Sequence, residues 1–253
     1  MYLDAQKADD YRRDGYVVLE NVFTPEQIAA MIAEIEGGGK VAENLRKRPD
    51  TAGKTANLAL WYDIGDDIWG AASINPKIVN SVRVLVGEEV TFFHGKVMMK
   101  EAKTGGRWEW HQDYGYWYDQ GFLYPRMMSA YVALDRATQE NGCLKVLKGS
   151  HHVGRLNHEK VGGQTGIDPN RIAALEDMFE LVYCEMGPGS VLFFDSNLLH
   201  SSGSNDSDYH RRAFIICFNA LANPQLKGYS EHDLEPVPCP VGDGHEFDRY
   251  VMA

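Results

Sequence analysis

The sequence predicts an all-β core with helices, an α+β protein in which a sandwich or jelly roll carries N-terminal helices on its outside. Three observations support this prediction. Residues 90–220 contain short runs rich in β-branched and aromatic residues, separated by turn signals. Residues 1–89 show apolar residues at helical spacing. No internal repeat or long linker divides the 253 residues, so we expect residues 1–253 to form one domain that ends in a tail over 221–253.

The N-terminal part is expected to be mainly helical. Thr24 is placed as the N-cap of a helix, because Pro25 suits the first helical position and Gln27 completes a capping box. Glycines at 37–39 end this helix. Residues 40–60 mix polar residues without a period, and we expect a mobile loop there. Helices are expected over residues 5–14, 25–36 and 76–86, and a strand over residues 15–19.

The rest of the chain is expected to form strands joined by turns. Asn141-Gly142 is a strong turn signal, and Gly187-Pro188-Gly189 predicts a tight turn between two apolar runs. Residues 157–180 interrupt the strands as an insertion, with a helix beginning at Asp168-Pro169, and long insertions in compact domains are often functional lids. Strands are expected over residues 90–100, 107–117, 127–134, 143–147, 181–184, 190–194 and 213–218.

Composition argues against several classes of partner. The net charge of −11 and the pI near 5.3 disfavour binding to nucleic acid or to an anionic membrane surface. The four cysteines have no CxxC spacing, so neither a zinc ribbon nor a disulfide framework is predicted. The sequence has no run of about 18 apolar residues and no apolar leader segment, and we expect a cytoplasmic protein.

The stretch Trp110-His111-Gln112-Asp113 carries the main chemical signal. If the aromatic run around it is a strand, His111 and Asp113 project on one face, roughly 6.6 Å apart at the backbone. With His200 from a distant segment, they would form a 2-His-1-carboxylate face, which is typical of non-haem Fe(II) oxygenases. An alternative stays open at this point, because a His and an Asp exposed on an edge strand would give the same pattern.

Several further motifs give the chain a family resemblance. Together with the His111–Asp113 motif they occur in the order found in the phytanoyl-CoA dioxygenase family of Fe(II)/2-oxoglutarate oxygenases, which the chain resembles from about residue 14 to residue 218. The resemblance implies a double-stranded β-helix, which is a jelly roll. The further motifs are Asp14-Gly15-Tyr16, Ala133-Leu134-Asp135, Glu140-Asn141-Gly142-Cys143-Leu144, Gly149-Ser150-His151, His200-Ser201-Ser202-Gly203 and Arg211.

The resemblance also implies which residues hold the metal and the cosubstrate. His111, Asp113 and His200 match the family's Fe(II) ligands. Arg211 matches the arginine that binds the distal carboxylate of 2-oxoglutarate, a task that suits a planar and permanently charged guanidinium. Ser202 matches a hydroxyl near that carboxylate, although a serine in a turn would be equally ordinary.

Further contacts are expected from the strand before the motif and from the motif itself. Lys96 and Lys100 share one strand face, and in relatives a polar residue of this strand reaches the cosubstrate or the substrate. Lysines on an exposed sheet face would explain them equally well. We assign Lys100 to the cosubstrate, and we assign Lys96, Gln112, Tyr116 and Trp117 to the substrate, with Gln112 facing away from the metal.

The implied reaction is hydroxylation of an unactivated C–H bond, coupled to conversion of 2-oxoglutarate and O₂ into succinate and CO₂. The carboxylate of Asp113 favours hydroxylation, because halogenating relatives have a small residue at this position. The aromatic residues could bind a cation, and no basic cluster suits the phosphates of CoA, so we expect a small polar or zwitterionic substrate such as an amino acid, a quaternary amine or an aminophosphonate. The alternatives are a hydroxylase of an acyl-CoA or a natural-product scaffold, and a non-catalytic metal-binding jelly-roll module.

Overall fold

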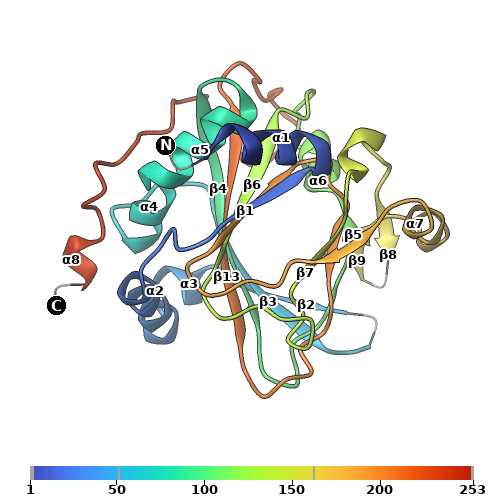
Figure 1. The fold of residues 1–253 in the computed structure, drawn as a ribbon, viewed down its shortest axis with the longest axis horizontal. Helices are drawn as coiled ribbons and strands as arrows, with labels where there is room; N and C mark the ends of the chain where they lie inside the picture. The colour runs from blue at the N-terminus through green and yellow to red at the C-terminus, as the bar shows by residue number, and fades with distance from the viewer. Residues whose placement is uncertain (1–2, 51, 162, 252–253) are drawn as a thin grey trace.

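Two antiparallel sheets enclose the centre of the protein, in a computed structural model that describes residues 3–50, 52–161 and 163–251 (Figure 1). The large sheet has the strand order β1-β11-β6-β13-β4-β3-β2, and the small sheet has the order β10-β7-β12-β5. The large sheet contains β1 (Tyr16–Leu19), β2 (Leu45–Pro49), β3 (Thr55–Trp61), β4 (Val90–Lys100), β6 (Met127–Ala133), β11 (Val191–Asp195) and β13 (Arg211–Ala220). The small sheet contains β5 (Trp108–His111), β7 (Leu144–Leu147), β10 (Leu181–Tyr183) and β12 (His200–Ser202).

Helices cover the outer face of the large sheet. Figure 1 shows α2, α4 and α5 on one side of this sheet, with β5, β7 and β9 on the other. The predicted capping box is present, since the Thr24 hydroxyl accepts a hydrogen bond from the Gln27 amide at 3.3 Å and the Gln27 side chain accepts one from the Thr24 amide at 3.0 Å. Among the helices of the described residues, none is long and apolar enough to cross a membrane. The helices are α1 (Ala5–Asp14), α2 (Pro25–Gly37), α3 (Gly39–Glu43), α4 (Ile68–Ser73), α5 (Pro76–Val86), α6 (Asp113–Asp119), α7 (Pro169–Glu176), α8 (Asp248–Val251) and the 3-10 turn η1 (Ser150–Val153).

Side-chain alternation along the central strand β13 separates two cores. Phe214 and Ile216 pack with residues of the outer helices, whereas Ile215 and Cys217 face the space between the two sheets. By the same alternation Arg211 faces the space between the sheets, where it is buried. The polar groups on the inward face of the large sheet are therefore the ones that can build a site.

Residues 40–60 do not form the mobile loop that we expected. They contain α3, β2 and β3, and β2 is the outer edge strand of the large sheet; residue 51 lies outside the described residues. All five residues of β2 are exposed and the three central ones are charged, so no apolar alternation marks it as a strand in the sequence. Its pairing with β3 places Arg46 opposite Leu58 and Arg48 opposite Ala56.

The aromatic run over 107–117 is a strand only in its first half. β5 ends at His111, and the helix α6 begins at Asp113. Gln112 stands between them in an extended conformation, with φ −113° and ψ 136°. The strand expected beyond His111 was therefore wrong, and Asp113 approaches His111 through a change from strand to helix instead of through strand alternation.

The insertion over 157–180 contains the predicted helix and an unpredicted hairpin. Asp168 caps α7 by accepting a hydrogen bond from the Asn170 amide at 3.0 Å. Before this helix, β8 (Glu159–Val161) and β9 (Gln164–Gly166) pair in an antiparallel hairpin, and β9 packs beside β5. The insertion therefore adds strands next to the one that ends at His111.

Candidate active site

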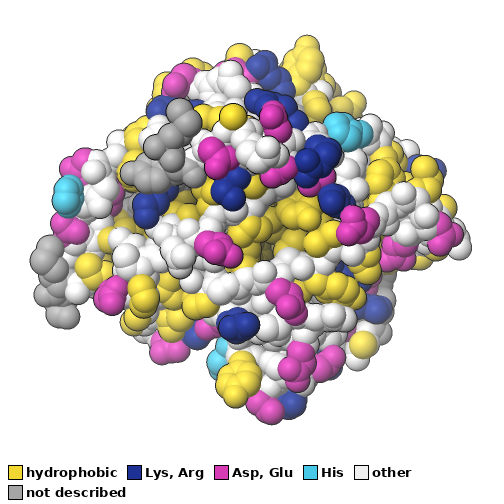
Figure 2. All heavy atoms as spheres, in the orientation of Figure 1, with side chains coloured by type: hydrophobic (Ala, Val, Ile, Leu, Met, Phe, Trp, Pro, Cys, Tyr) yellow, Lys and Arg dark blue, Asp and Glu magenta, His cyan; other side chains and the backbone are white. Residues whose placement is uncertain are grey.

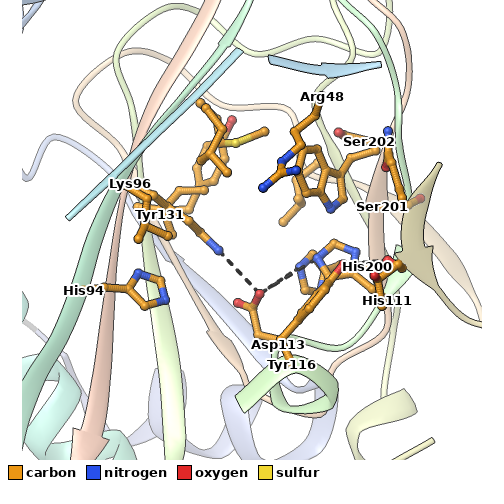
Figure 3. Close-up of a pocket in the computed structure, with 18 of the residues that line it drawn as sticks. Arg48, His94, Lys96, His111, Asp113, Tyr116, Tyr131, His200, Ser201 and Ser202 are labelled. Atoms are coloured by element: carbon orange, nitrogen blue, oxygen red, sulfur yellow. Dashed lines mark hydrogen bonds and ion pairs between the residues drawn. The ribbon is translucent and has the colours of Figure 1, made fainter. Parts of the chain in front are cut away.

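Three predicted ligands meet between the two sheets. His111 is the last residue of β5, His200 is the first residue of β12, and the two are register partners whose ring centroids lie 4.0 Å apart. Asp113 turns its Oδ1 toward both rings, at 3.9 Å from each Nε2 (Figure 3). One donor atom from each residue lies within 4.8 Å of the others, and all three residues are buried. Two imidazoles and one carboxylate on one side of a cavity form the face that holds a non-haem iron.

Backbone carbonyls and one serine orient these three side chains. Nδ1 of His111 lies 2.8 Å from the carbonyl of Glu109, and Nδ1 of His200 lies 2.9 Å from the carbonyl of Leu198. Because a carbonyl only accepts, each Nδ1 carries the proton and each Nε2 lone pair is free to bind a metal. The hydroxyl of Ser129 on β6 donates to Oδ2 of Asp113 at 2.6 Å, which leaves Oδ1 for the metal.

The protonation states of the triad suit a divalent cation. Burial alone would raise the pKa of Asp113, but the ammonium of Lys96 at 3.5 Å and the neighbouring imidazoles hold this pKa well below its usual range. Burial lowers the pKa of His111 and of His200. Ionised carboxylate and neutral imidazole are the forms that coordinate a metal, so the donor set fits Fe(II).

The residues predicted for the cosubstrate lie together beside the triad. Arg211 on β13 pairs with Lys100 on β4 in the sheet register, and both side chains are buried. The guanidinium of Arg211 donates to the Tyr131 hydroxyl at 3.0 Å and to the Gly142 carbonyl at 2.9 Å, while its Nε has no acceptor among the described residues. Nζ of Lys100 donates to the Ser202 hydroxyl at 2.7 Å.

Arg212 faces the opposite way from Arg211, as strand alternation predicts. Its guanidinium forms two hydrogen bonds with Asp135, at 2.8 Å and 2.9 Å, and a further one with Glu36 at 2.9 Å. Arg212 is therefore occupied on the outer face of the sheet, whereas Arg211 is the member of this pair of adjacent arginines that lines the cavity.

A cavity of about 420 Å³ opens over the triad and the Arg211 side chain. Lys96, Tyr116 and Trp117, which we assigned to the substrate, line this cavity. Tyr116 also donates a hydrogen bond to the Thr165 carbonyl at 2.6 Å, so it joins α6 to the β8–β9 hairpin.

Gln112 does not line the cavity, and its assignment to the substrate was wrong. Its side chain is fully buried and points away from the metal side, as expected, where it donates to the carbonyls of Gly154 and Asn197 and accepts from the Leu156 amide, each at 2.7 Å. Gln112 therefore fastens the start of the insertion to the segment before His200.

The β8–β9 hairpin forms part of the cavity wall. Lys160, Gln164 and Thr165 line the cavity from this side. The side chain of Gln164 accepts from the Glu109 amide at 3.0 Å and donates to the Arg107 carbonyl at 3.1 Å, which holds the hairpin against β5. Sequence reasoning did not find these wall residues, because their approach to the triad depends on tertiary packing.

Comparisons with known proteins agree with the family resemblance of the sequence. A model of the phytanoyl-CoA dioxygenase (PhyH) family matches residues 11–213. The chain belongs to this family. It is 28% identical over 236 residues to an ectoine dioxygenase of Bordetella bronchiseptica, covering 87% of the chain and 77% of the relative. It is 27% identical over 234 residues to an L-proline trans-4-hydroxylase of Streptomyces griseoviridis, covering 84% and 85%. The crystal structure of apo EctD from S. alaskensis superposes with a TM-score of 0.78 at 25% identity, covering 95% of the chain and 87% of EctD.

The family, the jelly-roll fold and the class of enzyme predicted from the sequence are confirmed. The match to EctD carries the fold, and the family match together with the His-Asp-His triad carries the class, a 2-oxoglutarate-dependent non-haem iron dioxygenase. Fe(II) and 2-oxoglutarate are accordingly its cofactor and cosubstrate.

Proposed function

We propose that this protein hydroxylates an unactivated C–H bond of a small polar or zwitterionic molecule and releases succinate and CO₂ from 2-oxoglutarate. The observation that carries the proposal is a three-donor face, His111, Asp113 and His200, that opens on a cavity also lined by the buried Arg211. The bound iron would supply the activation of O₂ through decarboxylation of the cosubstrate. The protein would hold the metal, fix the cosubstrate and place the substrate bond.

Arg211 is proposed to bind the distal carboxylate of 2-oxoglutarate. Tyr131 and Gly142 hold its guanidinium in place, and its unpaired buried Nε marks a donor that needs an acceptor. Burial, followed by the charge of Arg211, lowers the pKa of Lys100 well below its usual value. A dianionic cosubstrate beside Arg211 would offset this charge repulsion and favour the protonated form of Lys100, which is the physical reason for placing 2-oxoglutarate here.

Lys100 and Ser202 are proposed to act together in that subsite. Nζ of Lys100 holds the Ser202 hydroxyl and also the Gly203 carbonyl. Ser202 follows His200 on the short strand β12, and both residues line the same side of the cavity. Lys100 therefore positions a hydroxyl that can donate to the cosubstrate carboxylate beside Arg211.

Three observations support a small substrate and hydroxylation. A cavity of about 420 Å³ must hold the cosubstrate as well, which favours a small molecule over an acyl-CoA. The two relatives named above are, by their names, a dioxygenase of ectoine and a hydroxylase of L-proline. Asp113 fills the position at which a halogenase would need room for a halide.

All four cysteines are free and buried, which supports the expected cytoplasmic setting.

A succinate-release screen tests this function. The Fe(II)-loaded enzyme is incubated with 2-oxoglutarate, O₂ and single members of four sets: amino acids, quaternary amines, aminophosphonates and acyl-CoAs. We expect one of the first three sets to raise succinate release above the substrate-free rate, with a product 16 mass units heavier, as required by insertion of one oxygen atom. His200→Ala should abolish the release. Turnover of acyl-CoAs alone, or of no compound, would contradict the proposal.

A further inference from the structure

The edge strand β2 places two arginines in the wall of the cavity. Arg46 and Arg48 are two residues apart, so both project from the same face of the strand, and both line the cavity. Figure 3 shows the Arg48 side chain extending from this strand into the cavity, above the triad. Both arginines belong to the range 40–60, in which we expected a loop.

The sheet register explains why these side chains reach the site. Arg46 lies opposite Leu58 on β3, and Leu58 lies opposite Met98 on β4. Leu60 is paired in the same way with Lys96, whose ammonium is 3.5 Å from Asp113. The cavity face of the large sheet therefore runs from the metal side outward to the two arginines over an apolar floor.

The arginines of β2 carry unbalanced charge. Among the described residues, neither Arg46 nor Arg48 forms an ion pair or a hydrogen bond. Lys160 lines the cavity from the β8–β9 hairpin, whose Gln164 side chain donates to the Pro49 carbonyl of β2 at 3.4 Å. The only polar partner of Lys160 among the described residues is the Thr165 hydroxyl, at 3.3 Å. Three cations thus line the cavity from β2 and from the adjoining hairpin, and none of them pairs with a carboxylate among the described residues.

The charge count of the cavity points the same way. Five basic side chains line the cavity: Arg46, Arg48, Lys96, Lys160 and Arg211. Asp113 is the only carboxylate among the described lining residues. The cations exceed the carboxylate by four charges, and the charges of Fe(II) and of the 2-oxoglutarate dianion would cancel each other. The chain as a whole has a net charge of −11, and the face in Figure 2 mixes acidic with basic side chains. The positive cavity is therefore a local feature with no origin in the overall composition.

We propose that Arg46 and Arg48, with Lys160 of the β8–β9 hairpin, bind an anionic group of the substrate, a carboxylate or a phosphate or phosphonate. Guanidinium groups suit this task because each can donate two parallel hydrogen bonds to such a group. The inference rests on the proposed function, since it names the chemical class of the molecule that this site hydroxylates. The sequence showed no basic cluster suited to the phosphates of CoA, because Arg46, Arg48 and Lys160 come together only when β2 and β8 fold beside the cavity.

Binding of three probes that share a phenyl ring and differ in their polar group tests the proposal. The probes are phenyl phosphate, benzoate and uncharged benzyl alcohol, because the apolar floor can accept the ring in each case. Each is titrated by calorimetry into the anaerobic enzyme loaded with Fe(II) and 2-oxoglutarate. The proteins are wild type, Arg46→Gln, Arg48→Gln and the control Lys47→Gln, which removes a charge from the opposite face of the same strand.

We expect at least one anionic probe to bind the wild type at millimolar concentration or below, and to bind each arginine variant on the order of tenfold more weakly, the size of one charge-assisted contact. Lys47→Gln should bind like the wild type, and benzyl alcohol should not distinguish the proteins. Tighter binding of phenyl phosphate or of benzoate then tells whether the substrate group is a phosphate or a carboxylate.

Two results would overturn the proposal: failure of both anions to bind the wild type, or equal binding by the arginine variants. The visible charge-transfer band of the Fe(II)–2-oxoglutarate complex is recorded on the same samples. An intact band with no anion effect rejects the arginine site alone, whereas loss of the band in the wild type rejects the proposed function.

Discussion

Replacement of Ser129 by alanine should weaken metal binding without touching a ligand. The Ser129 hydroxyl donates to Oδ2 of Asp113 at 2.6 Å, and it also contacts Sγ of Cys217 at 3.3 Å. Without this donor, the buried carboxylate keeps Lys96 near Oδ1 but loses the group that fixes Oδ2. The carboxylate can then rotate away from the two imidazoles.

The expected size of the effect follows from that one hydrogen bond. A hydrogen bond to a charged group contributes about 1.5–3 kcal/mol. Lost from the metal-bound state, this corresponds to an affinity for Fe(II) lower by about 10- to 100-fold, the range seen when partners of metal ligands are removed. Ser129 is fully buried on β6. Because the substitution removes only one oxygen atom, the void that it leaves is small.

Anaerobic Fe(II) titration followed by calorimetry measures this effect. Ser73→Ala is the matched control, because Ser73 is equally buried but its hydroxyl donates to the Trp69 carbonyl within α4, away from the site. The control should bind Fe(II) like the wild type. If a folded Ser129→Ala protein also binds Fe(II) with unchanged affinity, the proposed orientation of Asp113 by Ser129 is wrong.

Three further predictions concern the cosubstrate, the pH dependence of stability and the insertion. Arg211→Ala should raise the KM for 2-oxoglutarate by about 30-fold or more, the scale of about 2 kcal/mol or more for a lost buried charge pair, and steady-state kinetics showing an unchanged KM would refute its role. Burial raises the pKa of Asp195 to about 6, so the folded protein prefers the protonated acid. The stability of the wild type is therefore highest below the unfolded pKa of this group, near 4, and it falls as the pH rises to 6 and above. Asp195→Asn should therefore gain up to about 2 kcal/mol of unfolding free energy over the wild type between pH 4 and 7, and urea unfolding curves that shift in parallel at both pH values would contradict this. A Cβ on Gly115 would overlap the imidazole of His158, so Gly115→Ala should expose the insertion to limited proteolysis, and a wild-type cleavage rate would refute the close packing.

The metal ligands could be predicted from the sequence because short motifs carry them. His111, Asp113 and His200 stand within recognisable local patterns, and Arg211 follows at a family-like distance. The secondary structure that brings Asp113 close to His111 was predicted wrongly. An aromatic run looks the same in a strand as in a short buried helix, and only tertiary packing decides that the strand ends at His111.

Other parts of the site have no local signal. Ser129 is one small polar residue in a buried strand, and nothing in its neighbourhood marks it as the partner of Asp113. Arg46 and Arg48 lie on an exposed edge strand without apolar alternation, so the sequence resembles a polar loop. Lys160 joins them only through the hairpin that packs on β5. These residues are brought together by pairing across the sheet, which a single sequence does not display.

The central claim is that His111, Asp113 and His200 bind Fe(II) in a form that accepts 2-oxoglutarate beside Arg211. The most direct measurement is the visible absorption of the anaerobic protein after addition of Fe(II) and then 2-oxoglutarate. We predict a weak charge-transfer band in the wild type that is absent in His111→Ala and in Asp113→Ala. A band that persists in both variants, or that never forms in the wild type, would contradict the claim.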